Sequence, residues 1–304
     1  MRDEARTKKS TNVRSNTYRL LSGAFRTWGR VAPESASRAM VSLMGRTVRG
    51  KPSTRAREVL ATGQRFAVDG PTGQLTGWTF GTGPTVYLAH GWNGRATQMT
   101  AFVPGIVSAG FRAVLYDQPG HGESAGRYAH VGLFAAAVGP VRDLFGPAHA
   151  VIAHSLGAAG VAVAQKRGDL DARRMVFVAP SSRPIEYVRA FARDFAAGPA
   201  HEDRFFRELT GRVGLDEHDL DVPAFALPAA TLVIHDRRDD DVAIDAGAAI
   251  ADRWPDATLY ATEGLGHTQI LRDPEAVGAA VDFVVHGSRP ARPWGGPLAS
   301  ASIA

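Results

Sequence analysis

The sequence predicts an α/β fold: a mainly parallel, doubly wound sheet of about eight strands, with an antiparallel N-terminal hairpin and a short helical lid. Three observations support this prediction. Short apolar runs rich in β-branched residues recur along residues 64–260. Helical stretches separate most of these runs, as expected for parallel strands joined by crossover helices. One interval between two runs, of about fifty residues, is much longer than a crossover needs.

Residues 1–57 form a basic extension that precedes the predicted sheet. They contain 14 Lys and Arg residues and 3 acidic residues, whereas the rest of the chain contains 21 basic and 27 acidic residues. Aromatic and leucine residues recur at helical spacing over residues 18–28, and a second amphipathic stretch follows Pro33. We expect these helices to pack on the body of the protein; contact with an anionic partner or membrane surface is the alternative.

The predicted strands follow the extension in a regular order. Arg65–Val68 and Leu75–Phe80 flank the turn-forming segment Asp69-Gly70-Pro71, so we expect an antiparallel hairpin. In a sheet of this class, ligands bind beyond the carboxyl ends of the parallel strands. Six further apolar runs follow the hairpin: Thr85–Ala89, Ala113–Tyr116, Ala150–Ala153, Met175–Val178, Leu232–Ile234 and Thr258–Tyr260.

The long interval and the C-terminal end of the chain lie outside this alternation. We expect a lid at about 181–226, where Ile185–Phe195 and Arg204–Leu209 have helical patterns and aromatic residues that pack in a core or, in a few cases, line an acyl pocket. Residues 288–304 are rich in Pro, Gly, Ala and Ser without periodicity, which predicts a disordered tail. The main domain would therefore span 58–287.

The composition excludes several kinds of protein. The chain of 304 residues has no cysteine, so it forms neither disulfides nor cysteine-ligated metal sites. It has no apolar run of membrane-spanning length, and residues 1–30 lack the apolar stretch of a secretory signal, so we expect a cytoplasmic protein. Because the excess positive charge is confined to residues 1–57, we expect no specific nucleic-acid partner and at most weak contact of that segment with an anionic surface.

The segment Ala153-His154-Ser155-Leu156-Gly157 is the most informative about chemistry. It lies between an apolar strand-like run and a run of small residues compatible with a helix. A serine on such a sharp strand-to-helix turn has a strained backbone that exposes its hydroxyl, and the residues two positions away on either side must be small. Ala153 and Gly157 are both small, although glycine is more usual at the first position. The pattern predicts Ser155 as a nucleophile.

A nucleophilic serine needs a base within hydrogen-bonding reach, and the base needs a carboxylate that orients it. The acidic loop 236–241 follows one of the later strands, and His267 follows the last one. The order Ser, Asp, His is the order expected when each residue follows its own strand. The acidic loop would thus supply the carboxylate. Two alternatives are that it is a solvated surface loop or that it binds a metal ion, although its carboxylates lack regular ligand spacing.

Together these motifs resemble those of the α/β-hydrolase superfamily over roughly residues 64–286. The resemblance implies that His267 is the base and Asp239 the acid, in the register G-x-x-D-x-x-V, with Asp236 where glycine is usual. Asp240 is the alternative acid. Besides the serine turn, the matching segments are HGWNGR at 90–95, DQPGHGES at 117–124 and GLGHT at 264–268.

The resemblance also implies roles for neighbouring residues. The backbone N–H groups of Trp92 and Leu156 would form the oxyanion hole. The Trp92 side chain would line the substrate pocket, with simple packing as the alternative, and His154 would shape the turn or the pocket. Asp117 and His121 would organise the floor near the site without taking part in chemistry.

A serine hydrolase that acts on a carboxylic ester through an acyl-enzyme intermediate is the activity that the resemblance implies. Such an enzyme needs no cofactor and no metal ion, and its partner is a small ester or acyl substrate. A thioesterase, amidase or acyltransferase would use the same site. Outside enzymes, a catalytically silent binding protein of this fold is the alternative.

Overall fold

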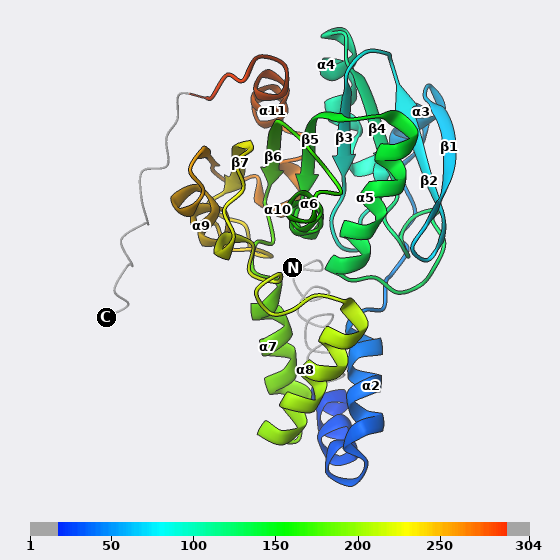
Figure 1. Ribbon diagram of the computed structural model, residues 1–304, viewed down its shortest axis with the longest axis vertical. Helices are drawn as coiled ribbons and strands as arrows, with labels where there is room; N and C mark the ends of the chain where they lie inside the picture. Colours follow the sequence, from blue (N-terminus) through cyan, green and yellow to red (C-terminus); the bar gives the residue numbers. More distant parts are fainter. Residues whose placement is uncertain (1–17, 291–304) are drawn as a thin grey trace, which may run out of the picture. The chain divides into compact units, whose positions relative to one another are not determined.

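The computed structural model describes residues 18–290 (Figure 1). These residues form two compact units, each of which is built from two stretches of the chain. The first unit consists of the described residues up to Arg46 together with Ile185–Leu215, and the second consists of Thr47–Pro184 together with the described residues from Asp216 onward.

This division differs from a simple order of extension, main domain and lid. The first unit combines residues 18–46 of the expected basic extension with most of the expected lid, although residues 47–184 separate the two stretches in the chain. Residues 47–57 belong to the second unit instead. Most of the tail expected at 288–304 lies outside the described residues.

The second unit contains a single eight-stranded sheet, as the sequence predicts. Its strand order is β1-β2-β4-β3-β5-β6-β7-β8. β2 is antiparallel to both β1 and β4, and all other neighbouring strands are parallel. The strands are β1 (Gln64–Gly70), β2 (Gly73–Phe80), β3 (Thr85–Ala89), β4 (Arg112–Tyr116), β5 (Ala148–His154), β6 (Arg174–Val178), β7 (Ala230–Asp236) and β8 (Ala257–Thr262).

Helices cover both faces of this sheet, which explains the composition of the strands (Figure 1). Every residue of the central strand β3 is buried, so its sequence is a continuous apolar run without alternation. One layer contains α3 (Thr54–Ala61), the 3-10 helix η1 (Ala96–Phe102), α4 (Val103–Ser108) and α11 (Pro274–His286), and the other contains α5 (Val131–Phe145), α6 (Leu156–Arg167), the 3-10 helix η2 (Val222–Ala224) and α9 (Asp245–Arg253).

The topology brings distant parts of the sequence to one edge of the sheet. Because β3, β5, β7 and β8 run in the same direction, their carboxyl ends lie along a single edge. The loops that begin at His90, Ser155 and Arg237 therefore leave the sheet on the same side, as does the loop that leads to α10 (Gly266–Gln269). This edge is where the sequence predicts the functional residues.

The first unit consists of helices. Helical residues 18–31 are followed by α2 (Pro33–Met44), and the later stretch supplies α8 (Pro199–Val213) and all but the first residue of α7 (Pro184–Phe195). Aromatic rings join the two stretches, since the Phe25 and Phe195 ring centroids lie 5.6 Å apart and Phe191 stacks on Phe195. Among the described residues, none of the helices is both long and apolar enough to cross a bilayer.

Candidate active site

Ser155 lies on a sharp turn between β5 and α6. Its backbone has φ 52° and ψ −125°, a conformation that is strained for a residue with a side chain. Two backbone hydrogen bonds hold Ser155 in this conformation. The Ser155 N–H donates to the Val178 carbonyl, and the Ser155 carbonyl accepts from the Ser181 N–H. The turn therefore holds the hydroxyl at the carboxyl end of β5.

Two glycines allow the loop after β3 to pack directly against this turn. A Cβ atom on Gly157 would lie 2.4 Å from the carbonyl oxygen of His90, and a Cβ atom on Gly91 would lie 2.7 Å from the Cβ atom of Ser155. Both positions exclude any larger residue without a shift of the backbone. The small residue that the sequence analysis requires after the serine is thus explained by the approach of the neighbouring loop.

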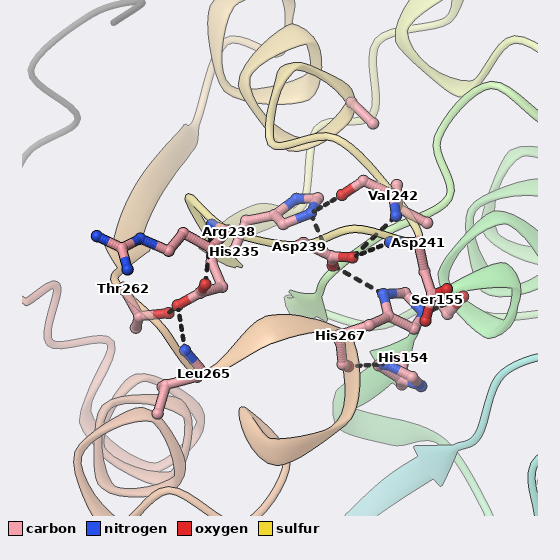
Figure 2. A network of polar contacts seen from close by, with 12 residues as sticks. His154, Ser155, His235, Arg238, Asp239, Asp241, Val242, Thr262, Leu265 and His267 are labelled. Atoms are coloured by element: carbon pink, nitrogen blue, oxygen red, sulfur yellow. Dashed lines mark hydrogen bonds and ion pairs between the residues drawn. The ribbon is translucent and has the colours of Figure 1, made fainter. Parts of the chain in front are cut away.

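Ser155, His267 and Asp239 form one continuous chain of contacts (Figure 2). The Nε2 atom of His267 lies 3.0 Å from Ser155 Oγ, and its Nδ1 atom lies 2.7 Å from Asp239 Oδ2. A carboxylate can only accept, so Nδ1 carries the hydrogen and Nε2 is free to accept from the serine hydroxyl. The alternative acid, Asp240, is exposed, and no contact joins it to His267 in the described structure.

The Asp239 carboxylate is fully surrounded by donors. Its Oδ1 atom accepts from the backbone N–H groups of Asp241 at 2.9 Å and Val242 at 2.8 Å. Its Oδ2 atom accepts from His267 and lies 3.3 Å from His235 Nε2. Burial acts to raise the pKa of Asp239, but the hydrogen bonds from the two histidines outweigh it and hold the pKa well below its usual value. Asp239 is therefore a buried anion at neutral pH.

His235 is a member of this cluster that the sequence analysis missed. Its side chain is fully buried, and its Nε2 atom lies 2.9 Å from the Val242 carbonyl as well as 3.3 Å from Asp239. Because both neighbours are acceptors, Nε2 carries the hydrogen. A Cβ atom on Gly247 would lie 2.6 Å from the opposite ring nitrogen, so α9 closes over the ring. A histidine at the end of an otherwise apolar strand was the available signal.

Asp236 holds the loop that carries His267. The structure places this aspartate, which stands where the family usually has glycine, entirely out of solvent at the end of β7. It accepts hydrogen bonds from Thr262 Oγ1 and from the N–H groups of Gly264 and Leu265. Burial acts to raise the pKa of Asp236, but hydrogen bonds, chiefly from the Leu265 N–H and Thr262 Oγ1, outweigh it and lower the pKa.

The His154 side chain is hydrogen-bonded to the backbone of His267. Its Nε2 atom lies 3.0 Å from the His267 carbonyl oxygen, to which it donates, and the two rings lie 4.7 Å apart. Burial, with a smaller contribution from His267, lowers the pKa of His154 to about 3, so this ring is neutral at neutral pH. The contact fits the expectation that His154 shapes the turn and does not act as the base.

The two N–H groups expected to form the oxyanion hole flank Ser155. Leu156 is the first residue of α6, where backbone N–H groups have no partner within the helix. Trp92 follows Gly91, whose Cα atom packs against Ser155. In the part of the chain that the structure describes, neither N–H donates to a protein acceptor. The Trp92 side chain is partly exposed and contacts the His121 ring edge-on.

Hydrogen bonds to two buried histidines connect the loop at 90–95 to the loop at 117–124, and this pair of contacts is called the His90–His121 clasp below. His90 Nε2 accepts from the Gln118 N–H at 2.9 Å, and His121 Nε2 accepts from the Asn93 N–H at 3.0 Å. The Asp117 carboxylate joins the same loops, because it accepts from the N–H groups of Ala96 and Glu123. These hydrogen bonds fix the backbone on both sides of Trp92 and therefore the direction of its N–H group.

The described residues contain no group of three or more His, Asp or Glu side chains arranged to hold a metal ion. Asp236 and Asp239 face inward and accept hydrogen bonds, while Asp240 and Asp241 are exposed. An ionised carboxylate, an imidazole and a hydroxyl in line are arranged to move one proton from the hydroxyl to the ring.

Comparison by sequence gives one family match. The family described as serine aminopeptidase, S33, matches residues 83–213. This range contains the loop after β3, the segment 117–124 and the serine turn, and it ends before Asp239 and His267. No curated relative matches the chain by sequence.

Comparison by structure gives many similar chains, whose low sequence identity makes them evidence for the fold alone. An esterase from Exiguobacterium antarcticum has a TM-score of 0.57 and 14% identity, over 73% of this chain and 99% of its own. An esterase from Thermogutta terrifontis has a TM-score of 0.54 and 18% identity, over 72% and 96%. A bromoperoxidase from Bacillus anthracis has a TM-score of 0.54 and 17% identity, over 73% and 99%.

These structures span enzymes with different reactions, so the shared element is the architecture. The sheet order, the serine turn and the family match all lead to the same assignment. The chain has the α/β-hydrolase fold.

Proposed function

We propose that this protein is a serine hydrolase that cleaves a carboxylic ester. The observation that carries the proposal is the unbroken chain of contacts from Ser155 Oγ through His267 to Asp239, at 3.0 Å and 2.7 Å. A hydroxyl is a weak nucleophile unless a base removes its proton as it attacks. The three residues supply the nucleophile, the base and the group that orients the base.

In the proposed first step, Ser155 Oγ attacks the ester carbonyl carbon while its proton moves to His267 Nε2. The carbonyl oxygen becomes an anion that accepts hydrogen bonds from the N–H groups of Trp92 and Leu156, the latter at the start of α6. The ester C–O bond then breaks, and the departing alkoxide takes the proton from His267. An acyl group remains bound to Ser155.

In the second step, water attacks the acyl carbon and gives its proton to His267, and the carboxylic acid leaves as Ser155 recovers its proton. Asp239 stabilises the imidazolium that forms in both steps without itself accepting a proton. Its low pKa supports this role, because the carboxylate stays ionised throughout. His154 is neutral and adds no repulsive charge beside the imidazolium.

The comparisons support hydrolysis of an ester but are compatible with other acyl substrates. The two similar structures from Exiguobacterium antarcticum and Thermogutta terrifontis are esterases, whereas the matching family is named for an aminopeptidase. An amidase would use the same residues, as would a thioesterase or an acyltransferase. The ester is proposed first because its leaving group departs more readily from the tetrahedral intermediate than an amine does.

The test uses p-nitrophenyl esters of graded chain length together with a fluorophosphonate probe that labels activated serines. The wild-type protein is expected to hydrolyse at least one ester and to react with the probe. Ser155→Ala is expected to lower kcat by about a thousandfold or more and to abolish labelling. Ser108→Ala, which alters an exposed serine at the end of α4, is the matched control and is expected to retain full activity.

Different results would favour the alternatives. A wild-type protein that neither labels nor hydrolyses any acyl substrate would be a silent binding protein. Cleavage of amides or thioesters in preference to matched esters would change the substrate class while leaving the site residues in place. Transfer of the acyl group to an added alcohol in preference to water would indicate an acyltransferase.

A further inference from the structure

The helix formed by residues 18–31 packs in its own unit through one aromatic ring and two small residues. Ser22, Phe25 and Gly29 are its buried positions, spaced three and four residues apart. Gly29 lies directly against the His201 ring, since a Cβ atom on it would lie 2.2 Å from the ring. Two of the three buried residues are therefore small, and Phe25 supplies the large apolar side chain of the packed face.

Four other apolar residues of this helix are exposed. Leu20 is 76% exposed and Val31 is 82% exposed, and they lie eleven residues apart on the side opposite the buried face. Leu21 and Trp28, on the flank of that side, are 39% and 41% exposed. Single exposed apolar residues are common, but a stripe of them along one helix indicates an interaction surface.

Arginines line the other flank of the apolar stripe. Arg19, Arg26 and Arg30 are exposed and recur at seven- and four-residue spacing, so they share one side of the helix. The Arg26 side chain donates a hydrogen bond to the Asp194 carbonyl within the unit. The exposed Arg19 and Arg30 side chains place positive charge beside the apolar stripe. An apolar stripe with arginines on one flank and tryptophan on the other is typical of a helix that lies in a bilayer interface.

The sequence argues against two other segments that could cover the stripe, namely residues 1–17 and a second copy of this chain. Residues 1–17 contain three apolar residues, Met1, Ala5 and Val13, and so cannot supply an apolar cover. A second copy of this chain would bring the same patch against itself across a two-fold axis. Such a contact would place a segment with 14 basic and 3 acidic residues against its own copy, which like-charge repulsion opposes.

We propose that the helix formed by residues 18–31 docks on an anionic lipid surface. Leu20 and Val31 enter the acyl region, Trp28 lies at the level of the headgroups, and Arg19 and Arg30 contact the lipid phosphates. The interaction is peripheral, because the helix keeps its opposite face packed against α7 and α8. It does not depend on the proposed ester hydrolysis.

The test is flotation of the full-length protein with vesicles at low ionic strength. One set consists of phosphatidylcholine and phosphatidylglycerol in equal parts, and the other of phosphatidylcholine alone. The protein is expected to float with the anionic vesicles only and to be released by high salt, which screens the arginines. Arg19→Gln with Arg30→Gln should weaken partitioning by about thirtyfold, at roughly fivefold for each arginine.

A second variant tests the apolar stripe. Leu20→Gln with Val31→Gln should weaken partitioning by about tenfold or more, because two apolar side chains no longer leave water. Leu144→Gln and Arg253→Gln, both at exposed positions of the second unit, are the matched controls and should bind as the wild type does. Thermal unfolding of each variant checks that the fold is retained, as expected for substitutions at exposed positions.

Three results would overturn the proposal. The wild-type protein could fail to float with anionic vesicles, or the Leu20→Gln/Val31→Gln variant could float equally well. Sedimentation could also reveal a dimer that this variant abolishes, which would make a second copy the occupant. In each case, retained hydrolysis by the same samples would leave the proposed function unaffected.

Discussion

At the scale of single residues, Asp239 is distinguished by the number of donors around its carboxylate. Two backbone N–H groups occupy Oδ1, and two histidines approach Oδ2. His235 fixes the plane of the carboxylate from the side opposite His267. A carboxylate that cannot rotate keeps the His267 ring in one orientation, which is what proton transfer from Ser155 requires.

This geometry predicts that His235→Leu lowers kcat with little change in KM. The expected loss is about tenfold or more, the size of one hydrogen bond to a charged group. His235→Gln keeps an N–H donor at a position similar to Nε2 and is expected to recover most of the loss. Steady-state kinetics on the best p-nitrophenyl ester provides the measurement.

The matched control for this pair is His149, a partly buried histidine at the opposite end of the sheet whose Nε2 atom donates to the Val284 carbonyl. His149→Leu removes a comparable hydrogen bond away from the site and should leave kcat unchanged. Equal losses for His235→Leu and His235→Gln would show that the ring contributes only packing. A wild-type rate for His235→Leu would remove His235 from the positioning of Asp239.

At the scale of elements, the loops at 90–95 and 117–124 are joined through neutral histidines. Burial lowers the pKa of His121, and burial together with His121 lowers the pKa of His90 well below its usual value. Each Nε2 atom accepts from a backbone N–H, so a proton on either ring would remove an acceptor. The clasp therefore depends on pH.

The sign of this dependence follows from the direction of the pKa shifts. A histidine with a lowered pKa in the folded protein binds its proton preferentially in the unfolded chain, where the pKa is about 6.5. The free energy of unfolding should therefore fall as the pH decreases below about 6.5. His121→Gln keeps an acceptor for the Asn93 N–H but removes one titrating side chain. The free energy of unfolding of this variant should therefore depend on pH less steeply than that of the wild type, by up to about 1.4 kcal/mol per pH unit.

Urea unfolding at a series of pH values between neutrality and moderate acidity measures this slope. Phe134→Leu is the control, because the Phe134 ring packs on His121 at 5.5 Å without titrating. It should lower stability by a similar amount at every pH. Parallel profiles for the wild type and His121→Gln would show that His121 does not carry the expected proton linkage.

The elements of the sheet were predictable because each strand is a local pattern. Buried parallel strands such as Thr85–Ala89 are short apolar runs, and they ended where polar loops began. The serine turn, the acidic loop and His267 were also accessible, since each follows its own strand, and the family resemblance indicated Asp239 within that loop. In contrast, the contacts between His90, Gln118, His121 and Asn93 join loops from different strands, which no local pattern encodes, and the position of His235 at a strand end does not reveal its partner.

At the scale of the whole molecule, the first unit is discontinuous in sequence. The sequence indicated a helical extension and a separate helical lid, but periodicity alone does not say which apolar faces meet. In the structure, Phe25 of the extension contacts Phe195 of α7, and α2 packs on α8. Neither stretch buries these faces without the other, so the two stretches are expected to gain and lose their structure together.

Phe25→Ala tests this coupling by hydrogen exchange. Removing a buried phenylalanine costs about 3 kcal/mol or more, which corresponds to exchange roughly a hundredfold faster for amides that open with the unit. Faster exchange is expected in both 18–46 and 185–215, while amides of the buried strands β3 and β5 keep their protection. Val31→Ala, at an exposed position of the same helix, is the control and should change neither stretch. Faster exchange confined to residues 18–46 would mean that α7 and α8 hold their structure without the extension, because a shared core requires both stretches to respond to the loss of one ring.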